Sequence, residues 1–247
     1  MGRKTKMKDK FAIVTGASTG IGRVIALAFA KEGANVALVG KNEEKLLETS
    51  NLIEKIGGKS KVFICDLANI SSLNTLVASI KRETNRIDIL VNVAGIWHGK
   101  DEVYAGKDFE SFPESVILDT YSVGLTAPTL LSHALIPLMS DGSTVINLSG
   151  TFESGGKGWL PYYVSKRAIE DLSIGLSQEL ADKGIRVNCV SPSDTATEEY
   201  KRFFPEDAKD AQTPEEVAKL FVELVNKGET GKVFVIKKGK VEEGFHK

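Results

Sequence analysis

A glycine-containing turn between an apolar run and a helical pattern constrains this chain more than any other feature. Residues 14–22 read Val-Thr-Gly-Ala-Ser-Thr-Gly-Ile-Gly, after the apolar run 11–13 and before an apolar helical pattern at 24–30. Glycine lacks a Cβ, so the chain can turn tightly there and present backbone N–H groups at the positive end of a helix. Three glycines near a strand are more often a simple turn. The flanking strand and helix nevertheless favour pyrophosphate binding over that interpretation.

Strand-like and helix-like stretches alternate along the whole chain. Apolar runs typical of strands occur at 11–14, 36–39, 61–65, 87–93, 144–148, 185–190 and 232–236. Helical periodicity occupies 23–32, 42–56, 70–84, 114–139, 161–183 and 214–227. This alternation predicts an α/β fold of the Rossmann-like type: a doubly wound, mainly parallel seven-stranded sheet with helices on both faces. No repeat or linker divides the chain, so we expect a basic tail at 1–8 and a single domain at 9–247.

The composition argues against several classes of function. The chain has 32 basic and 33 acidic residues, a net charge of −1, so it has no strong field to attract nucleic acid or a membrane. The basic residues at 1–8 have no interleaved aromatic residue, which favours a solvated tail over a nucleic-acid-binding arm. Cys65 and Cys189 lie in strand-like runs and are expected to be buried free thiols. This use of cysteine predicts a cytoplasmic protein, and no metal site is predicted.

A tyrosine and a lysine four residues apart form the second chemical signal. Tyr162 and Lys166 would share one helix face, so the ammonium group would lie near the phenol and lower the phenol pKa. Tyr163 is only three residues from Lys166 and is expected to line the site.

Together these motifs resemble the short-chain dehydrogenase/reductase family over roughly residues 8–240. The resemblance rests on the Thr-Gly-x-x-x-Gly-Ile-Gly turn, on Asn92-Val93-Ala94-Gly95 and on Tyr162-x-x-x-Lys166 followed by Arg-Ala, in that order. It implies an oxidoreductase that moves a hydride between a nicotinamide cofactor and a carbonyl or alcohol carbon. Tyr162 would be the general acid and base, and Lys166 would lower its pKa and hold the ribose hydroxyls.

The resemblance also implies a catalytic serine. Ser149 stands 13 residues before Tyr162, the usual family separation, and would donate a hydrogen bond to the substrate oxygen. Ser154 is the fallback, because Gly150 replaces the second serine that many members carry. The simpler alternative is that Ser149 only ends a strand.

The family's cofactor site can be carried over residue by residue. It comprises Gly16, Ser18, Thr19, Gly20, Ile21, Gly22, Lys41, Asp66, Leu67, Asn92, Ala94, Gly95, Tyr162, Lys166, Pro192, Thr195 and Thr197. Asp66 would accept a bond from the adenine amino group with Leu67 beside the ring, although Asp66 could equally cap the next helix.

The end of the second predicted strand favours NADP(H) over NAD(H). An acidic residue there would bind the 2′-hydroxyl of NAD, but this chain has Gly40 followed by the cationic Lys41. The alternative is that Lys41 is a solvated lysine at the start of a helix.

Four departures from the family pattern support a rival function: three replaced residues and a C-terminal strand, 232–236, that lacks the usual Asp-Gly-Gly after it. Gly124 stands where many members carry an Asn that holds a proton-relay water, Val93 replaces a second Asn, and Ser193 replaces a glycine. We expect the volume vacated at Gly124 to admit a less ordered water. The rival is a nucleotide-binding regulatory or scaffold protein with lost or weak turnover.

The segment around 193–212 occupies the position of the family's mobile substrate lid. It carries Tyr200, Lys201, Arg202, Phe203 and Phe204, which predict an apolar small-molecule substrate with some negative charge, unless the two phenylalanines only pack the lid. Trp97 and His98 follow the fourth strand as candidate rim residues, although His98 is given no chemical role. The family also implies a homo-oligomer, a dimer or tetramer, formed through the helices at 114–139 and 161–183.

Overall fold

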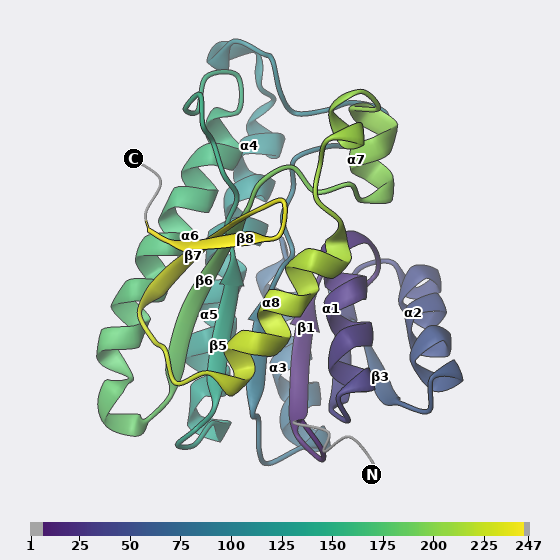
Figure 1. Cartoon of the computed structure of the whole chain (residues 1–247), viewed down its shortest axis with the longest axis vertical. Helices are drawn as coiled ribbons and strands as arrows, with labels where there is room; N and C mark the ends of the chain where they lie inside the picture. Colours follow the sequence, from purple (N-terminus) through teal and green to yellow (C-terminus); the bar gives the residue numbers. More distant parts are fainter. Residues whose placement is uncertain (1–6, 245–247) are drawn as a thin grey trace.

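The computed structural model describes residues 7–244, which form one sheet flanked by helices (Figure 1). The strands are β1 (Phe11–Thr15), β2 (Asn35–Gly40), β3 (Lys59–Ile64), β4 (Ile89–Asn92), β5 (Thr144–Leu148), β6 (Arg186–Pro192), β7 (Lys232–Lys237) and β8 (Lys240–Glu243). They lie in the order β3-β2-β1-β4-β5-β6-β7-β8, and β1 to β7 pair in parallel. The predicted α/β doubly wound fold is therefore confirmed.

The sheet has eight strands, not the predicted seven. The additional strand β8 pairs antiparallel with β7 through a tight turn at Lys238 and Gly239, whose φ angles are 47° and 73°. All four residues of β8 are exposed, so the strand carries no alternation of buried and exposed side chains that a sequence pattern could reveal.

Helices precede or follow nearly every strand and end close to the predicted positions. They are α1 (Gly20–Lys31), α2 (Glu43–Lys55), α3 (Ile70–Glu83), α4 (Glu114–Tyr121), α5 (Ala127–Leu135), α6 (Leu160–Glu179), α7 (Glu198–Phe203) and α8 (Pro214–Asn226). Side-chain caps fix several of the starts: Asn42 caps α2, Asn69 caps α3 and Thr213 forms a capping box on α8. The stretch 114–139, predicted as one helix, is instead divided by a π-helical turn at Ser122–Thr126 and ends in a 3-10 turn at Ile136–Leu138.

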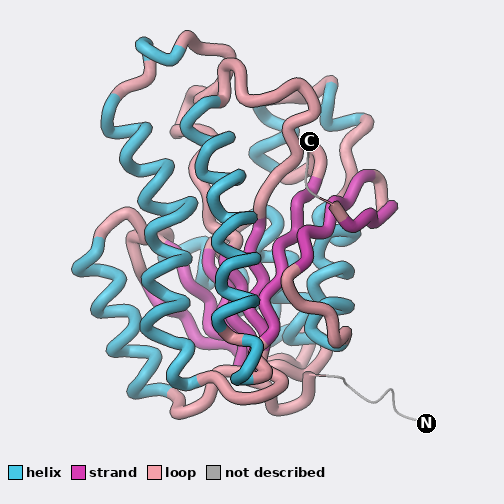
Figure 2. The backbone as a smooth tube through the Cα atoms, turned by 90° about the vertical axis from the view of Figure 1, so that its left-hand side faces the viewer, coloured by secondary structure: helices cyan, strands magenta, loops and turns pink. Residues whose placement is uncertain are grey.

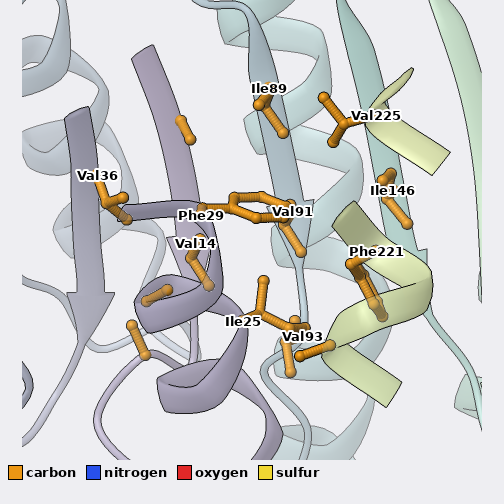
Figure 3. Packing of buried hydrophobic residues seen from close by; sticks show 14 of the residues in the cluster. Val14, Ile25, Phe29, Val36, Ile89, Val91, Val93, Ile146, Phe221 and Val225 are labelled. Carbon is orange, nitrogen blue, oxygen red and sulfur yellow. The ribbon is translucent and has the colours of Figure 1, made fainter. Parts of the chain in front are cut away.

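Two apolar cores lie on opposite faces of the sheet because side chains alternate along each strand. Val14 of β1 packs with Ile25 and Phe29 of α1 and with Phe221 of α8 (Figure 3). On the other face, Ile13 belongs to the core formed with helices α3 and α5. Strands buried on both faces explain the continuous apolar runs in the sequence.

The predicted basic tail falls almost wholly outside the described residues. Residues 1–6 are not described, whereas Met7 is fully buried and belongs to the core that contains Val14. The folded domain therefore includes Met7, two residues earlier than its predicted start.

The order of the strands places a cleft between β1 and β4. From β1 the chain moves outward to β2 and β3, and it then returns to β4 on the other side of β1. The two crossovers leave in opposite directions, so a crevice opens at the carboxyl ends of these strands. Figure 2 shows the sheet between its two layers of helices. Within residues 7–244, no helix combines the length and apolar character needed to cross a membrane.

Candidate active site

A cleft of about 370 Å³ lies at this crevice. All but three of the predicted cofactor residues line it. The residues that do are Gly16, Ser18, Thr19, Gly20, Ile21, Gly22, Lys41, Asp66, Leu67, Ala94, Gly95, Tyr162, Lys166 and Thr197. Residues that directly follow β1, β2, β3 and β4 therefore meet residues of α6 in one concave site, as the order of their motifs predicts.

The glycines of the turn are required by close backbone approach. Gly16 has a φ of +67°, and a Cβ there would lie 3.0 Å from Ala94 Cα. At Gly22, a Cβ would lie 2.2 Å from the carbonyl oxygen of Gly16. Gly20 also has a positive φ, +54°, and faces the Thr197 side chain. The turn is thus packed against both β4 and the start of the lid, and only glycine fits at these positions.

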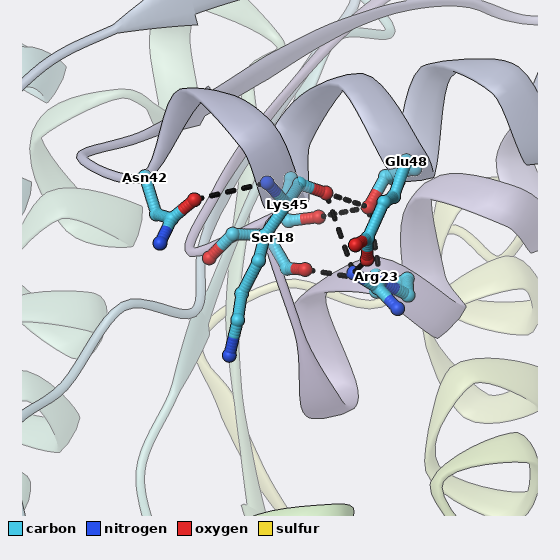
Figure 4. A network of polar contacts seen from close by, with 7 residues as sticks. Ser18, Arg23, Asn42, Lys45 and Glu48 are labelled. Atoms are coloured by element: carbon cyan, nitrogen blue, oxygen red, sulfur yellow. Dashed lines mark hydrogen bonds and ion pairs between the residues drawn. The ribbon is translucent and has the colours of Figure 1, made fainter. Parts of the chain in front are cut away.

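Arg23 fixes the turn to α2, a role that the sequence analysis missed. Its Nε lies 3.0 Å from both the Ser18 carbonyl and Thr49 Oγ1, and its guanidinium pairs with Glu48 at 2.9 Å (Figure 4). Thr49 in turn donates to the Ala17 carbonyl at 3.0 Å. These bonds hold the outer side of the turn and leave its inner side facing the cleft.

Asp66 and Leu67 line the cleft after β3. Asp66 Oδ1 accepts from the Ala68 amide at 3.0 Å, a local turn at the end of the strand. The alternative that Asp66 caps the next helix is wrong, because Asn69 accepts from the Ser72 amide and caps α3.

Tyr162 and Lys166 stand on the first two turns of α6 and face the cleft, whereas Tyr163 packs over Gly156. Lys166 is buried; its Nζ donates to the Leu148 carbonyl at 2.8 Å and lies 5.3 Å from the centre of the Tyr162 ring. Burial lowers the pKa of Lys166 to about 8. Burial also raises the pKa of the Tyr162 phenol above its ordinary value, so the predicted lowering of that pKa is wrong in this structure.

Ser149 lies at the end of β5, but it turns away from the cleft. Its hydroxyl lies 2.7 Å from Glu170 Oε1 and 2.8 Å from the Lys166 carbonyl oxygen, and it is 1% exposed. Glu170 is equally buried and forms an ion pair of 2.9 Å with Arg167. Sequence reasoning missed Glu170, because a glutamate in an amphipathic helix ordinarily signals a solvated face. The fallback Ser154 is exposed and does not line the cleft.

Three predicted cofactor residues lie outside the cleft. Asn92 is buried and donates from Nδ2 to Asn147 Oδ1 at 2.8 Å, which joins β4 to β5. Thr195 is buried and donates to the Ser193 carbonyl at 2.8 Å. Pro192 is the last residue of β6 and is also buried. The structure places all three behind the residues that line the site.

The expected vacancy at Gly124 is filled by Ser165. Gly124 lies in the π-helical turn, and a Cβ there would lie 2.9 Å from both Cβ and Oγ of Ser165. The expectation of a vacated volume is therefore wrong: helix α6 approaches this turn too closely for an added side chain.

Several residues that line the cleft were not predicted. Trp97 and His98 line it as expected of rim residues, but Asp119, Val123, Glu198 and Glu199 were not singled out. They lie on α4, the π-helical turn and α7, and no local motif marks them. Only the position of these helices above the sheet brings them to the site.

The fold and the cleft define a dinucleotide-binding α/β protein, and comparison with known proteins identifies its family. The family model for short chain dehydrogenases matches residues 10–208 of this chain. The uncharacterized oxidoreductase YciK of Escherichia coli K12 is 34% identical over 247 residues, covering 95% of this chain and 94% of YciK. YhxC of Bacillus subtilis 168 is 34% identical over 189 residues, covering 76% of this chain and 64% of YhxC. The chain therefore belongs to the short-chain dehydrogenase/reductase family of oxidoreductases.

Solved structures agree with this assignment. A short chain dehydrogenase of Burkholderia cenocepacia in complex with NADP has a TM-score of 0.85 at 26% identity, covering 95% of this chain and 98% of that chain. One of Escherichia coli CFT073 complexed with NADPH has a TM-score of 0.84 at 30% identity, covering 95% of this chain and 99% of that chain.

Proposed function

We propose that the protein is an NADP(H)-dependent oxidoreductase that interconverts a carbonyl compound and its alcohol, with Tyr162 as general acid and base. The observation that carries this proposal is the position of Tyr162 and Lys166 on the wall of the cleft whose floor is the glycine turn. A proton donor thus stands in the same crevice as the proposed dinucleotide site.

The residues present fit a dinucleotide. The positions of Gly16 and Gly22 exclude any side chain, and the turn between them leads into the N-terminus of α1, where backbone N–H groups favour a pyrophosphate. Ser18, Thr19, Ala94 and Thr197 would complete the phosphate and ribose contacts. When bound, the cofactor supplies or accepts the hydride.

In the reduction, Tyr162 would give its phenolic proton to the carbonyl oxygen as a hydride forms the new C–H bond. The carbonyl π electrons become the O–H bond of the alcohol, so the charge balances. A raised phenol pKa keeps Tyr162 protonated near neutral pH, which suits its role as the acid. Lys166 would stabilise the phenolate left after the transfer, and Gly95 leaves room for it, because a Cβ there would lie 3.3 Å from Nζ.

Ser149 would assist only after its hydroxyl leaves Glu170. As the backbone lies at the end of β5, rotation of the serine side chain is the change that would aim the hydroxyl at a substrate oxygen. We therefore propose Ser149 as a conditional donor and Tyr162 as the primary one.

The proposed preference for NADP(H) rests on Lys41 and on the absence of an acid at the end of β2. Gly40 and Lys41 line the cleft, and Lys41 is exposed, where it can meet a 2′-phosphate. The relatives crystallised with NADP or NADPH support this proposal.

A regulatory or scaffold protein that binds the nucleotide without efficient turnover is the second candidate. The orientation of Ser149 toward Glu170 favours it, because the site then lacks the second hydrogen-bond donor to the substrate.

The test is NADPH oxidation against a panel of ketones and aldehydes, with calorimetric measurement of NADPH binding. Tyr162→Phe should abolish turnover and leave NADPH affinity nearly unchanged, since only the transferable proton is lost. Tyr163→Phe is the matched control and should retain most of the activity. Tight NADPH binding without turnover on any carbonyl would favour the second candidate, and a dead Tyr163→Phe would overturn the assignment of Tyr162.

A further inference from the structure

Aromatic side chains from three separate segments gather beside Tyr162. They come from the loop after β4, from residues 152–163 and from α7, and include both tryptophans of the chain. We call them the ring cluster: Trp97, His98, Phe152, Trp159, Tyr162, Tyr163, Tyr200, Phe203 and Phe204. Figure 1 shows α7, which carries Tyr200 and Phe203 and is followed by Phe204, beyond the end of the sheet.

The ring cluster forms a continuous path from Tyr162 to the lid. The centroid of the Trp159 ring lies 6.1 Å from the centroid of the Tyr162 ring and 6.2 Å from the centroid of the Phe204 ring. Phe204 in turn stacks on Trp97 at 6.3 Å with an interplanar angle of 28°. Trp97, His98 and Tyr162 line the cleft and Trp159 lies directly beside Tyr162, so a planar molecule whose carbonyl reached Tyr162 would lie among aromatic rings.

The exposure of these rings distinguishes them from a core. Phe29 and Phe221, which belong to the apolar core on one face of the sheet, are both 0% exposed. Every member of the ring cluster is instead half-buried. Large apolar rings left partly open beside a cleft are typical of a surface that receives an apolar ligand.

The charges around the ring cluster disfavour an anionic ligand. Arg202 pairs with Asp101 at 3.0 Å and lies over the Phe203 ring at 4.9 Å, so its charge ties the lid to the loop after β4. Asp119 and Glu198 line the cleft as well. The expected preference for some negative charge on the substrate rested on Lys201 and Arg202, and the pairing with Asp101 withdraws Arg202 from that support.

We propose that the substrate is an uncharged, flat aromatic or fused-ring ketone, or the alcohol formed from it, held by the ring cluster against Tyr162. This inference rests on the proposed function and specifies the substrate class of the same site. Trp159 is its central residue, because its ring contacts both the proposed acid and the lid.

The test compares β-tetralone, a flat bicyclic ketone, with 2-decanone, an open-chain ketone of equal carbon count. We expect kcat/KM with NADPH to be at least about 10-fold higher for β-tetralone. Trp159→Leu should lower kcat/KM for β-tetralone about 10-fold and change kcat/KM for 2-decanone less than about twofold. Trp159→Phe retains a ring and should therefore keep most of the activity on β-tetralone. Phe109→Leu is the control, since Phe109 is exposed and belongs neither to the cleft lining nor to the ring cluster.

Binding of β-tetralone to the protein saturated with NADP⁺, measured by calorimetry, separates this inference from the proposed function. If no ketone is reduced but β-tetralone binds and Trp159→Leu weakens that binding, the ring cluster is supported and the proposed function fails. If both ketones are reduced equally, or Trp159→Leu and Trp159→Phe impair both equally, the inference about the ring cluster is overturned while the proposed function stands.

Discussion

The proposed cofactor half and the proposed substrate half of the cleft differ in the groups that form their surfaces. Around β1, β2 and α1 the surface is mainly backbone, and Gly16 and Gly22 leave no space for a Cβ. Around α6 and α7 the surface is mainly side chains, which include Tyr162 and Glu198, with the half-buried rings of Trp159 and Phe204 beside them. The first half resembles the family motif closely, whereas the second contains most of the departures from it.

This difference follows from what each half has to bind. A dinucleotide always presents the same phosphates and riboses, so a fixed backbone cradle suits it and side chains add little. A substrate differs from one enzyme to another, so its half of the site is shaped by side chains that can change without altering the fold. We therefore expect substitutions in the glycine cradle to have the largest effects, and substitutions of individual side chains in either half to have smaller ones.

The largest effect is expected for Gly22→Ala. The new Cβ would lie 2.2 Å from the Gly16 carbonyl oxygen, a backbone atom that cannot move without displacing the turn. We expect the free energy of unfolding to fall by more than about 3 kcal/mol and NADPH binding to be lost. Urea denaturation and calorimetry would measure both quantities.

The matched control for this substitution is Gly175→Ala in α6, where an added Cβ meets nothing within 4 Å. It should leave stability unchanged or raise it by up to about 1 kcal/mol, because alanine favours a helix over glycine. An equal loss in both variants would show that close backbone approach does not set the cofactor half apart.

A smaller effect is expected for Glu170→Gln in the substrate half. Glutamine can still accept from Ser149, but the charge opposite Arg167 is lost, so the free energy of unfolding should fall by about 1–3 kcal/mol. Glu170 also raises the pKa of Lys166, so its removal should lower that pKa further below about 8. Glu179→Gln, at an exposed position of the same helix, is the control.

The pH dependence of stability provides the specific readout of Glu170→Gln. Because burial lowers the Lys166 pKa, the unfolded chain binds more protons above that pKa and stability from this group rises as pH increases from about 8 toward the ordinary lysine value. In Glu170→Gln this rise should begin at lower pH. Urea denaturation over a pH series would detect it, and an unchanged onset would show that Glu170 does not act on Lys166.

The smallest effect is expected for Lys41→Ala, since this exposed side chain contributes one charge to the cofactor half. NADPH affinity should fall about 5–30-fold, or about 1–2 kcal/mol, while NADH affinity changes less than about twofold. Lys55→Ala at the far end of α2 is the control. Equal affinities of the unmutated protein for NADPH and NADH would contradict the proposed preference.

Most of the fold could be predicted from the sequence because its signals are local. The strands β1, β2, β4, β5, β6 and β7 are mostly buried apolar runs, and the glycine turn and the Tyr162–Lys166 pair each span only a few residues. The exposed strand β8 and the π-helical turn at Ser122–Thr126 were missed, since neither carries an apolar period of its own.

The sequence by itself determined the order of the elements and the residues of the glycine turn, because each depends on neighbours in the chain. Only the tertiary structure decided how the substrate half is arranged. Ser149 forms a hydrogen bond with Glu170, 21 residues later in the chain. Ser165 of α6 fills the space beside Gly124. The rings of Trp97, Trp159 and Phe204 lie together although they come from three segments. Such contacts depend on how closely helices and lid pack over the sheet, and no local pattern of residues specifies that distance.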